Sequence, residues 1–109
     1  MTPSNPLEAV RRLAVSLETC EFYKAVAEEL PRRKMDSDDL LEILRSEIGE
    51  THCYHTASTR KKYPSTMSDY YSFWVDVCGE HMFIKLLIVD FGATSERLVV
   101  TSFKKDIRK

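Results

Sequence analysis

The C-terminal half of the chain contains three runs of residues with the pattern of β-strands, all between residues 70 and 104. Each run is rich in β-branched and aromatic residues, and it alternates or stays apolar over about five to eight positions. A short turn containing Gly79 separates the first two runs, and a looser segment at residues 90–96 separates the last two. The pattern predicts an antiparallel meander with its second strand at residues 82–89 and its third at residues 98–103.

Alternation of side chains along a strand predicts which residues share a face of this sheet. In the first run we expect one face to hold Phe73, Val75 and Val77, and the other to hold Trp74, Asp76 and Cys78. Phe73 and Trp74 are both expected in the core, because large aromatic side chains dominate small cores. A further strand is expected at residues 51–56, with Cys53 and His55 on the same face.

The N-terminal half has the helical pattern instead, with apolar residues three or four positions apart. We expect Asn5 to cap a first helix that begins at Pro6. A second helix is expected at residues 21–30 and should end at Pro31, because proline removes a backbone donor. A third is expected to start after Asp36 and to bury Leu40, Leu41, Ile43 and Leu44. Two or three helices followed by about four strands predict an α+β fold.

Length and composition favour one small domain of the cytoplasm. The 109 residues leave no room for two cores, so we expect a single domain with a helical part at residues 1–48 and a sheet part at residues 51–105. No run approaches the roughly 18 to 20 apolar residues of a membrane span, and the N-terminus lacks the pattern of a signal peptide. Cys20, Cys53 and Cys78 have no paired spacing and are expected to stay thiols.

The charges are unevenly distributed along the chain. Residues 1–50 hold 7 Lys and Arg against 11 Asp and Glu, which gives −4, while residues 51–109 hold 9 against 6, which gives +3. A basic sheet beside an acidic helical half would suit a polyanion on one surface. A solvated surface that binds no polyanion explains the same distribution of charge.

A basic cluster with an aromatic neighbour lies between the candidate first strand and the meander, at Arg60, Lys61, Lys62 and Tyr63. Phosphates bind such cations, and unpaired bases stack on flat side chains. The cluster is therefore a candidate loop for binding nucleic acid. The alternative is a solvated turn, which short basic runs often form.

Several short motifs in this half resemble one known family. They are His-Cys-Tyr-His-Thr at residues 52–56, Pro-Ser-Thr-Met-Ser-Asp-Tyr-Tyr at residues 64–71, Phe-Trp-Val-Asp-Val at residues 73–77, Met-Phe-Ile-Lys at residues 82–85 and Val-Val-Thr-Ser-Phe-Lys at residues 99–104. Together they resemble the MqsR family, the motility quorum-sensing regulator toxins, over roughly residues 40–105. The most specific parts are Trp-x-Asp-Val and the closing Ser-Phe-Lys.

The resemblance implies an endoribonuclease, an mRNA interferase toxin of a type II toxin–antitoxin pair, with a RelE-like fold of helices packed on a twisted antiparallel sheet. Such enzymes use no metal or other cofactor, and they direct the ribose 2′-OH against its own phosphate. The implied partners are RNA, either free mRNA or mRNA on the ribosome, and a cognate antitoxin protein. The enzyme must supply a base, an acid and cations for the charge that develops on phosphorus.

The family's polar positions carry over only in part. Its C-terminal lysine falls on Lys104, which would stabilise the phosphorane. Its lysine in the strand before the loop falls on His55, and an imidazole is a suitable acid or base near neutral pH. Its tyrosine in the hairpin strand falls on Phe83 and its glutamine falls on Val75, neither of which can replace the polar group. Tyr70, Tyr71, Lys85 and Arg60 are the candidates to take over these roles.

The sequence thus predicts two sets of site residues. The catalytic candidates are His55, Lys104, Lys85 and Tyr71. The RNA-binding candidates are Arg60, Lys61, Lys62, Tyr63, Tyr70 and Lys105. Structural alternatives remain open: His55 as an ordinary strand histidine, Lys85 extending its ammonium from a sheet edge, and the terminal lysines as a solvated tail.

A zinc site and a binding module are the two alternatives to the nuclease. Histidine and cysteine at positions 52, 53, 55, 78 and 81 are zinc-ligand types, but their spacing lacks a partner pair, so we expect no metal. The second is a RelE-like binding module with weakened catalysis that acts through a protein partner. It is favoured by Val75 and Phe83 at expected polar positions, and by the near-neutral isoelectric point of about 6.3.

Overall fold

The computed structural model describes residues 1–59, 66–90 and 95–108, which form helices packed on a mixed β-sheet. In chain order the elements are α1 (Leu7–Leu13), β1 (Cys20–Phe22), α2 (Lys24–Arg32), α3 (Ser37–Glu42), a π-helical turn (Ile43–Glu47), a 3-10 turn (Glu50–His52), β2 (Cys53–Thr59), β3 (Thr66–Val75), β4 (Glu80–Asp90) and β5 (Glu96–Lys105). The predicted α+β class is confirmed.

The sheet differs from the prediction in size and direction. Within the described ranges it has five strands in the order β1-β5-β4-β3-β2, not about four. Strands β2 to β5 form the predicted antiparallel meander, but β1 joins β5 in parallel, with Cys20 opposite Leu98. The first residues of the predicted second helix are in fact this strand, so residues 1–48 are not wholly helical.

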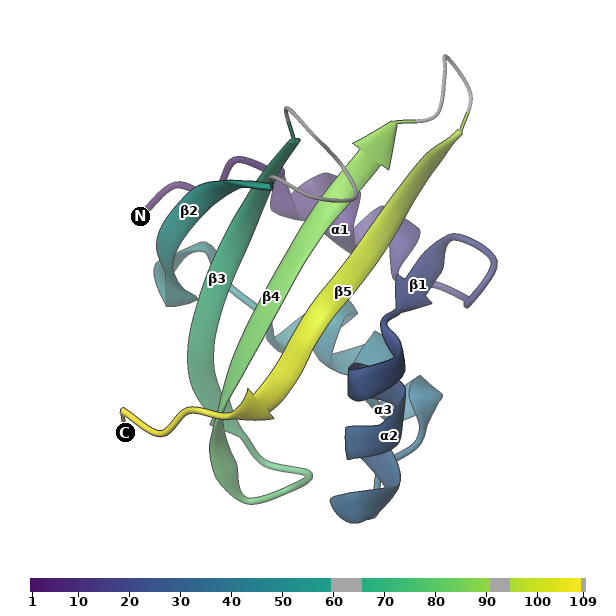
Figure 1. The fold of residues 1–109 in the computed structure, drawn as a ribbon, viewed down its shortest axis with the longest axis vertical. Coiled ribbons are helices and arrows are strands. Elements are labelled where there is room, and N and C mark those ends of the chain that lie inside the picture. Colours follow the sequence, from purple (N-terminus) through teal and green to yellow (C-terminus); the bar gives the residue numbers. More distant parts are fainter. Residues whose placement is uncertain (60–65, 91–94, 109) are drawn as a thin grey trace.

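One face of the sheet is covered by the N-terminal helices, with α1 and α3 lying behind the strands in Figure 1. From the sheet, the buried side chains of this core are Tyr71, Phe73, Val75, Met82, Ile84, Leu86, Leu98, Val100 and Phe103. From α1, α3 and the π-helical turn they are Val10, Leu13, Leu40, Leu41, Ile43 and Leu44. Trp74 was wrongly expected in this core: its side chain points to the other face and is 56% exposed.

The residues before α1 connect the N-terminus to the sheet. Asn5 does not cap the helix as predicted, because Pro6 is the N-cap residue and the helix begins at Leu7. Asn5 instead donates from Nδ2 to Asp69 and to the Met67 carbonyl, each at 2.9 Å, and its Oδ1 accepts from the backbone N–H of Ile88 at 3.0 Å. A single buried amide therefore satisfies polar groups of both β3 and β4.

Helix α2 ends at Arg32, two residues past the predicted range of 21–30, and Pro31 lies inside it and does not end it as predicted. Two carbonyl groups in its last turn accept hydrogen bonds from residues after the helix. The Met35 N–H donates to the Leu30 carbonyl, and the Lys34 N–H donates to the Pro31 carbonyl. This is a Schellman ending, with Lys34 at the left-handed position (φ 58°) that glycine usually occupies. Helix α3 begins at Ser37, after the predicted cap residue Asp36, which forms a reciprocal capping box with Asp39.

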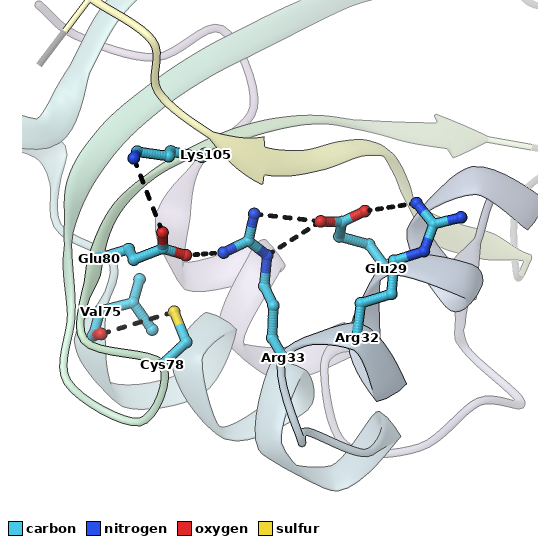
Figure 2. Close-up of polar contacts among 7 residues, drawn as sticks. All are labelled: Glu29, Arg32, Arg33, Val75, Cys78, Glu80 and Lys105. Atoms are coloured by element: carbon cyan, nitrogen blue, oxygen red, sulfur yellow. Dashed lines mark hydrogen bonds and ion pairs between the residues drawn. The ribbon is translucent and has the colours of Figure 1, made fainter.

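Ion pairs connect the end of α2 to the β3–β4 hairpin (Figure 2). Arg33 lies between Glu29 of its own helix and Glu80 at the start of β4, and it contacts both carboxylates. Lys105, at the end of β5, places its Nζ 3.9 Å from Glu80. These contacts hold the hairpin against the helical half.

In the part of the chain that the structure describes, no helix has the length and apolar character needed to span a membrane.

Candidate functional site: a sheet face with aromatic rings and cations

A bulge in β2 determines which face of the sheet His55 occupies. Cys53 pairs with Tyr71, whereas His55 pairs with Tyr70, so Tyr54 is an extra residue without a partner in the ladder. Cys53 and His55 were predicted to share a face, and the bulge shows this to be wrong. Cys53 enters the core at 2% exposure, while His55 is exposed on the opposite face.

His55 begins a row of side chains that crosses four strands. It lies opposite Tyr70, which lies opposite Lys85, which lies opposite Ser102. The His55 ring meets the Tyr70 ring edge to face, with centroids 4.9 Å apart. Lys85 Nζ lies 5.1 Å from the centroid of the same tyrosine ring. An imidazole and an ammonium group are therefore both in contact with one aromatic ring.

A second row lies directly beside the first. Ser72 is opposite Phe83, and Phe83 is opposite Lys104. The ring centroids of Phe83 and Tyr70 are 5.7 Å apart, and Lys104 Nζ lies 5.7 Å from the Phe83 centroid. Lys104 thus joins His55 and Lys85 on the same face, as the sequence-based site requires.

The bulged residue Tyr54 adds a third ring to the face. Its centroid lies 6.2 Å from that of Tyr70 and 6.4 Å from that of Phe83. The guanidinium carbon of Arg108 lies 4.0 Å above the Tyr54 ring, a distance at which a cation is attracted to the ring face. Burial and the nearby Asp106 and Tyr70 raise the pKa of the Tyr54 phenol although Arg108 opposes them, so the phenol stays protonated near neutral pH.

We call this surface the ring-and-cation face, and its residues are Tyr54, His55, Tyr70, Phe83, Lys85, Lys104 and Arg108. Chemically it combines an accessible imidazole, three cations and three aromatic rings. Cations bind phosphate oxygens, and rings stack on unpaired bases, so the face has the composition of a surface for single-stranded nucleic acid.

Tyr71 does not belong to this face, contrary to its prediction as a catalytic residue. It pairs with Cys53 and Ile84 on the helix-covered side and is fully buried. Burial raises the pKa of its phenol well above the ordinary value, so it does not ionise near neutral pH. A group enclosed in the core cannot contact an RNA phosphate.

The predicted RNA-binding residues have different outcomes. Tyr70 lies at the centre of the ring-and-cation face. Lys105 is engaged with Glu80 in the ion-pair group of Figure 2, although its chain borders the same hollow as Lys104. The cluster Arg60, Lys61, Lys62 and Tyr63 lies outside the described residues.

Sequence reasoning missed Tyr54 and Arg108 and interpreted Phe83 only as a lost tyrosine. Tyr54 joins the face through a bulge, which alternation cannot reveal. Arg108 follows the last strand, where a basic residue is typical of a solvated tail. The sequence feature that indicates a fixed Arg108 is Asp106, two positions earlier. In the structure the Asp106 carboxylate accepts hydrogen bonds from Arg108 Nε at 3.0 Å and Nη2 at 2.9 Å.

The histidine and cysteine residues considered as zinc ligands do not meet at one site. His52 stacks on Phe73 of the core side, with centroids 4.6 Å apart, whereas His55 lies on the other face. Across residues 1–59, 66–90 and 95–108 no group of three histidine, cysteine or acidic side chains is placed to hold a metal ion. Cys20, Cys53 and Cys78 are free thiols.

Comparison with known proteins adds no relative. The chain matches no model of a protein family and no curated protein.

Proposed function

We propose that this protein is a metal-independent endoribonuclease, the toxin of a toxin–antitoxin pair, as its resemblance to the MqsR family implies. The observation that supports the proposal is the row in which His55 and Lys85 both contact the ring of Tyr70, with Lys104 in the next row. These residues come from four different strands, β2 to β5. Their meeting on one face is what RNA cleavage by this chain requires.

The proposed reaction assigns one role to each group. His55 accepts the proton of the 2′-OH, whose oxygen then forms a bond to the adjacent phosphorus. The ammonium of Lys104 stabilises the extra negative charge of the phosphorane. The bond from phosphorus to the 5′-oxygen breaks, and the Lys85 ammonium donates a proton to that oxygen. The products are a 2′,3′-cyclic phosphate and a 5′-hydroxyl end.

Tyr70 has a positioning role in this proposal. Its ring lies between His55 and Lys85, so both side chains rest against a rigid aromatic surface. Of the family's missing polar groups, the glutamine position is Val75, which is fully buried on the helix side.

A second candidate is a binding module without efficient cleavage, and Phe83 favours it. Phe83 lies on this face, with its ring centroid 5.7 Å from that of Tyr70, at the position where the resembling family has a tyrosine. A phenyl ring can stack but cannot donate a proton. Such a module would retain the fold and act by binding a partner.

The test is cleavage of single-stranded RNA by the purified protein in the presence of EDTA. We expect cleavage that EDTA does not abolish, with 2′,3′-cyclic phosphate ends detected by mass spectrometry. His55→Ala and Lys104→Ala should each lower the rate about 100-fold or more, because one acid–base group contributes about 10² to 10⁴ in rate and one group that stabilises the developing charge about 10² to 10³. Arg32→Ala is the control, since it removes an exposed cation from α2.

Two results would overturn parts of this proposal. RNA that is bound but left intact would favour the binding module over the enzyme. Cleavage by His55→Ala at the rate of the unaltered protein would remove His55 from the mechanism. In cells, the proposal also expects growth arrest on induction, relieved by both substitutions and by co-expression of a cognate antitoxin.

A further inference from the structure

The chain after β5 crosses the end of the sheet beside the ring-and-cation face (Figure 1). Residues 106–108, here the C-terminal segment, continue past the ends of β4 and β3 toward β2 (Figure 1). The Asp106 N–H donates to the His81 carbonyl at 2.9 Å, and the Asp106 carboxylate accepts from the hydroxyl of Ser72. Asp106 is only 4% exposed, so it fixes this segment to the end of the sheet, while Ile107 is 92% exposed.

Asp106 fixes the position of Arg108. The carboxylate accepts from Nε and Nη2 of the guanidinium at 3.0 and 2.9 Å, and Arg108 then lies over Tyr54. The hydrogen bonds from Arg108 and Ser72 lower the pKa of the Asp106 carboxyl far below its ordinary range, so the carboxylate stays ionised near neutral pH. The cation is therefore held in place before any ligand arrives.

The C-terminal segment and the rings border an open hollow of about 250 Å³. Its lining includes Tyr54, Tyr70, Phe83, Lys104 and the segment. Sites for drug-sized molecules begin at about 300 Å³, so this hollow suits a single small ring system. The three rings meet at angles of 52° to 79° and are not stacked in parallel, which lets a planar ligand place its face against one of them.

We infer that this hollow binds one nucleobase of a single-stranded RNA, with the phosphate of that nucleotide on Lys104 and Arg108. The inference rests on the proposed function and adds a base subsite to it. The rings supply stacking surface, and the two cations match the negative charge of a nucleotide. A neutral aromatic ligand would engage the rings alone, whereas a nucleotide engages the rings through its base and the cations through its phosphate.

The experiment compares nucleotides with and without a base. The ¹⁵N-labelled protein is titrated with AMP, CMP, GMP and UMP, and separately with ribose 5-phosphate, while amide shifts are followed by NMR. We expect at least one nucleotide to shift the amides of Tyr54, Tyr70, Phe83 and Arg108. Ribose 5-phosphate should bind at least tenfold more weakly, because a stacked base contributes several-fold to over a hundred-fold in affinity.

Variants test the residues that form the hollow. Arg108→Ala and Tyr54→Leu should each weaken nucleotide binding about fivefold to tenfold, while the rest of the amide spectrum stays that of the folded protein. Arg32→Ala, which also removes one exposed arginine, should bind as the unaltered protein does. Unchanged affinity in Arg108→Ala and Tyr54→Leu would overturn the inference.

The two proposals fail in different ways. Equal binding of ribose 5-phosphate and the nucleotides overturns the base subsite but leaves RNA cleavage untouched. Nucleotide shifts confined to residues away from the hollow also overturn it. Absence of RNA cleavage with base-dependent nucleotide binding would overturn the nuclease and retain the subsite as part of a binding module.

Discussion

The hydroxyl of Tyr71 is fully buried and makes no hydrogen bond among the described residues. A buried polar group without a partner costs about 1 to 3 kcal/mol of desolvation. Tyr71→Phe removes that group and keeps the ring, so we expect the free energy of unfolding to stay equal or rise by up to about 1 kcal/mol. Urea unfolding followed by tryptophan fluorescence measures the change.

The same substitution distinguishes a core role from catalysis. RNA cleavage by Tyr71→Phe should equal that of the unaltered protein, because the phenol lies on the helix-covered side. Tyr70→Phe is the matched variant on the exposed face, because it also removes a single tyrosine hydroxyl and keeps the ring. It shows what the same chemical change does within the ring-and-cation face. A large loss of cleavage in Tyr71→Phe without a loss of stability would return Tyr71 to the active site.

At the scale of elements, the N-terminal segment depends on Asn5 and Asp69. The Asp69 carboxylate is fully buried and accepts from the backbone N–H groups of Ser4 and Asn5 at 2.8 and 2.7 Å. The Asn5 amide adds a third donor and also satisfies Ile88. We expect Asn5→Ala to lower the free energy of unfolding by about 2 to 4 kcal/mol, because several buried polar groups lose their partners together.

Ser4→Ala is the control for this prediction. The Ser4 hydroxyl contacts Thr56 at an exposed position, while its backbone N–H, which the substitution keeps, binds Asp69. Its loss should cost less than about 1 kcal/mol. Denaturant midpoints for the two variants give the comparison, and equal effects would show that the Asn5 side chain has no special role.

The elements differ in how far the sequence predicts them. The strands of the meander follow from local periodicity, and the capping box of α3 follows from the spacing of Asp36 and Asp39. Strand β1 has only three residues and forms by pairing with β5, almost eighty positions later, so no local pattern reveals it. Asn5 has the composition of a helix cap, and only the folded sheet supplies its preferred partners.

The candidate site was predictable in the same partial way. Lys85, Tyr70 and Lys104 share a face because strand alternation places them there. His55 joins them only through the bulge at Tyr54, which the sequence does not mark. Without the bulge, alternation assigns His55 to the face of Cys53, inside the core.

Considered as a whole molecule, the sheet separates two surfaces with different roles. Its inner face packs on the helices of the acidic half, and its outer face holds Lys85, Lys104 and Arg108. The C-terminal segment joins three strands of this sheet, because Asp106 bonds to Ser72 of β3 and His81 of β4, and Arg108 covers Tyr54 of β2. The Asp106 carboxylate therefore links the packing at this end of the sheet to the position of Arg108 on the outer surface.

Asp106 predicts how the stability of the molecule depends on pH. Its folded-state pKa lies below the ordinary value of about 3.9, so its contribution is present above that pH and is lost as pH falls toward the folded value. Asp106→Asn should therefore be less stable than the unaltered protein at pH 7 and at pH 5. The difference in urea midpoint should shrink steadily between pH 4 and pH 2, because protonation removes the same charge that the substitution removes. Asp38→Asn, which changes an exposed acid of α3, should show no comparable convergence, and a difference for Asp106→Asn that stayed constant down to pH 2 would contradict the ionised contact with Arg108.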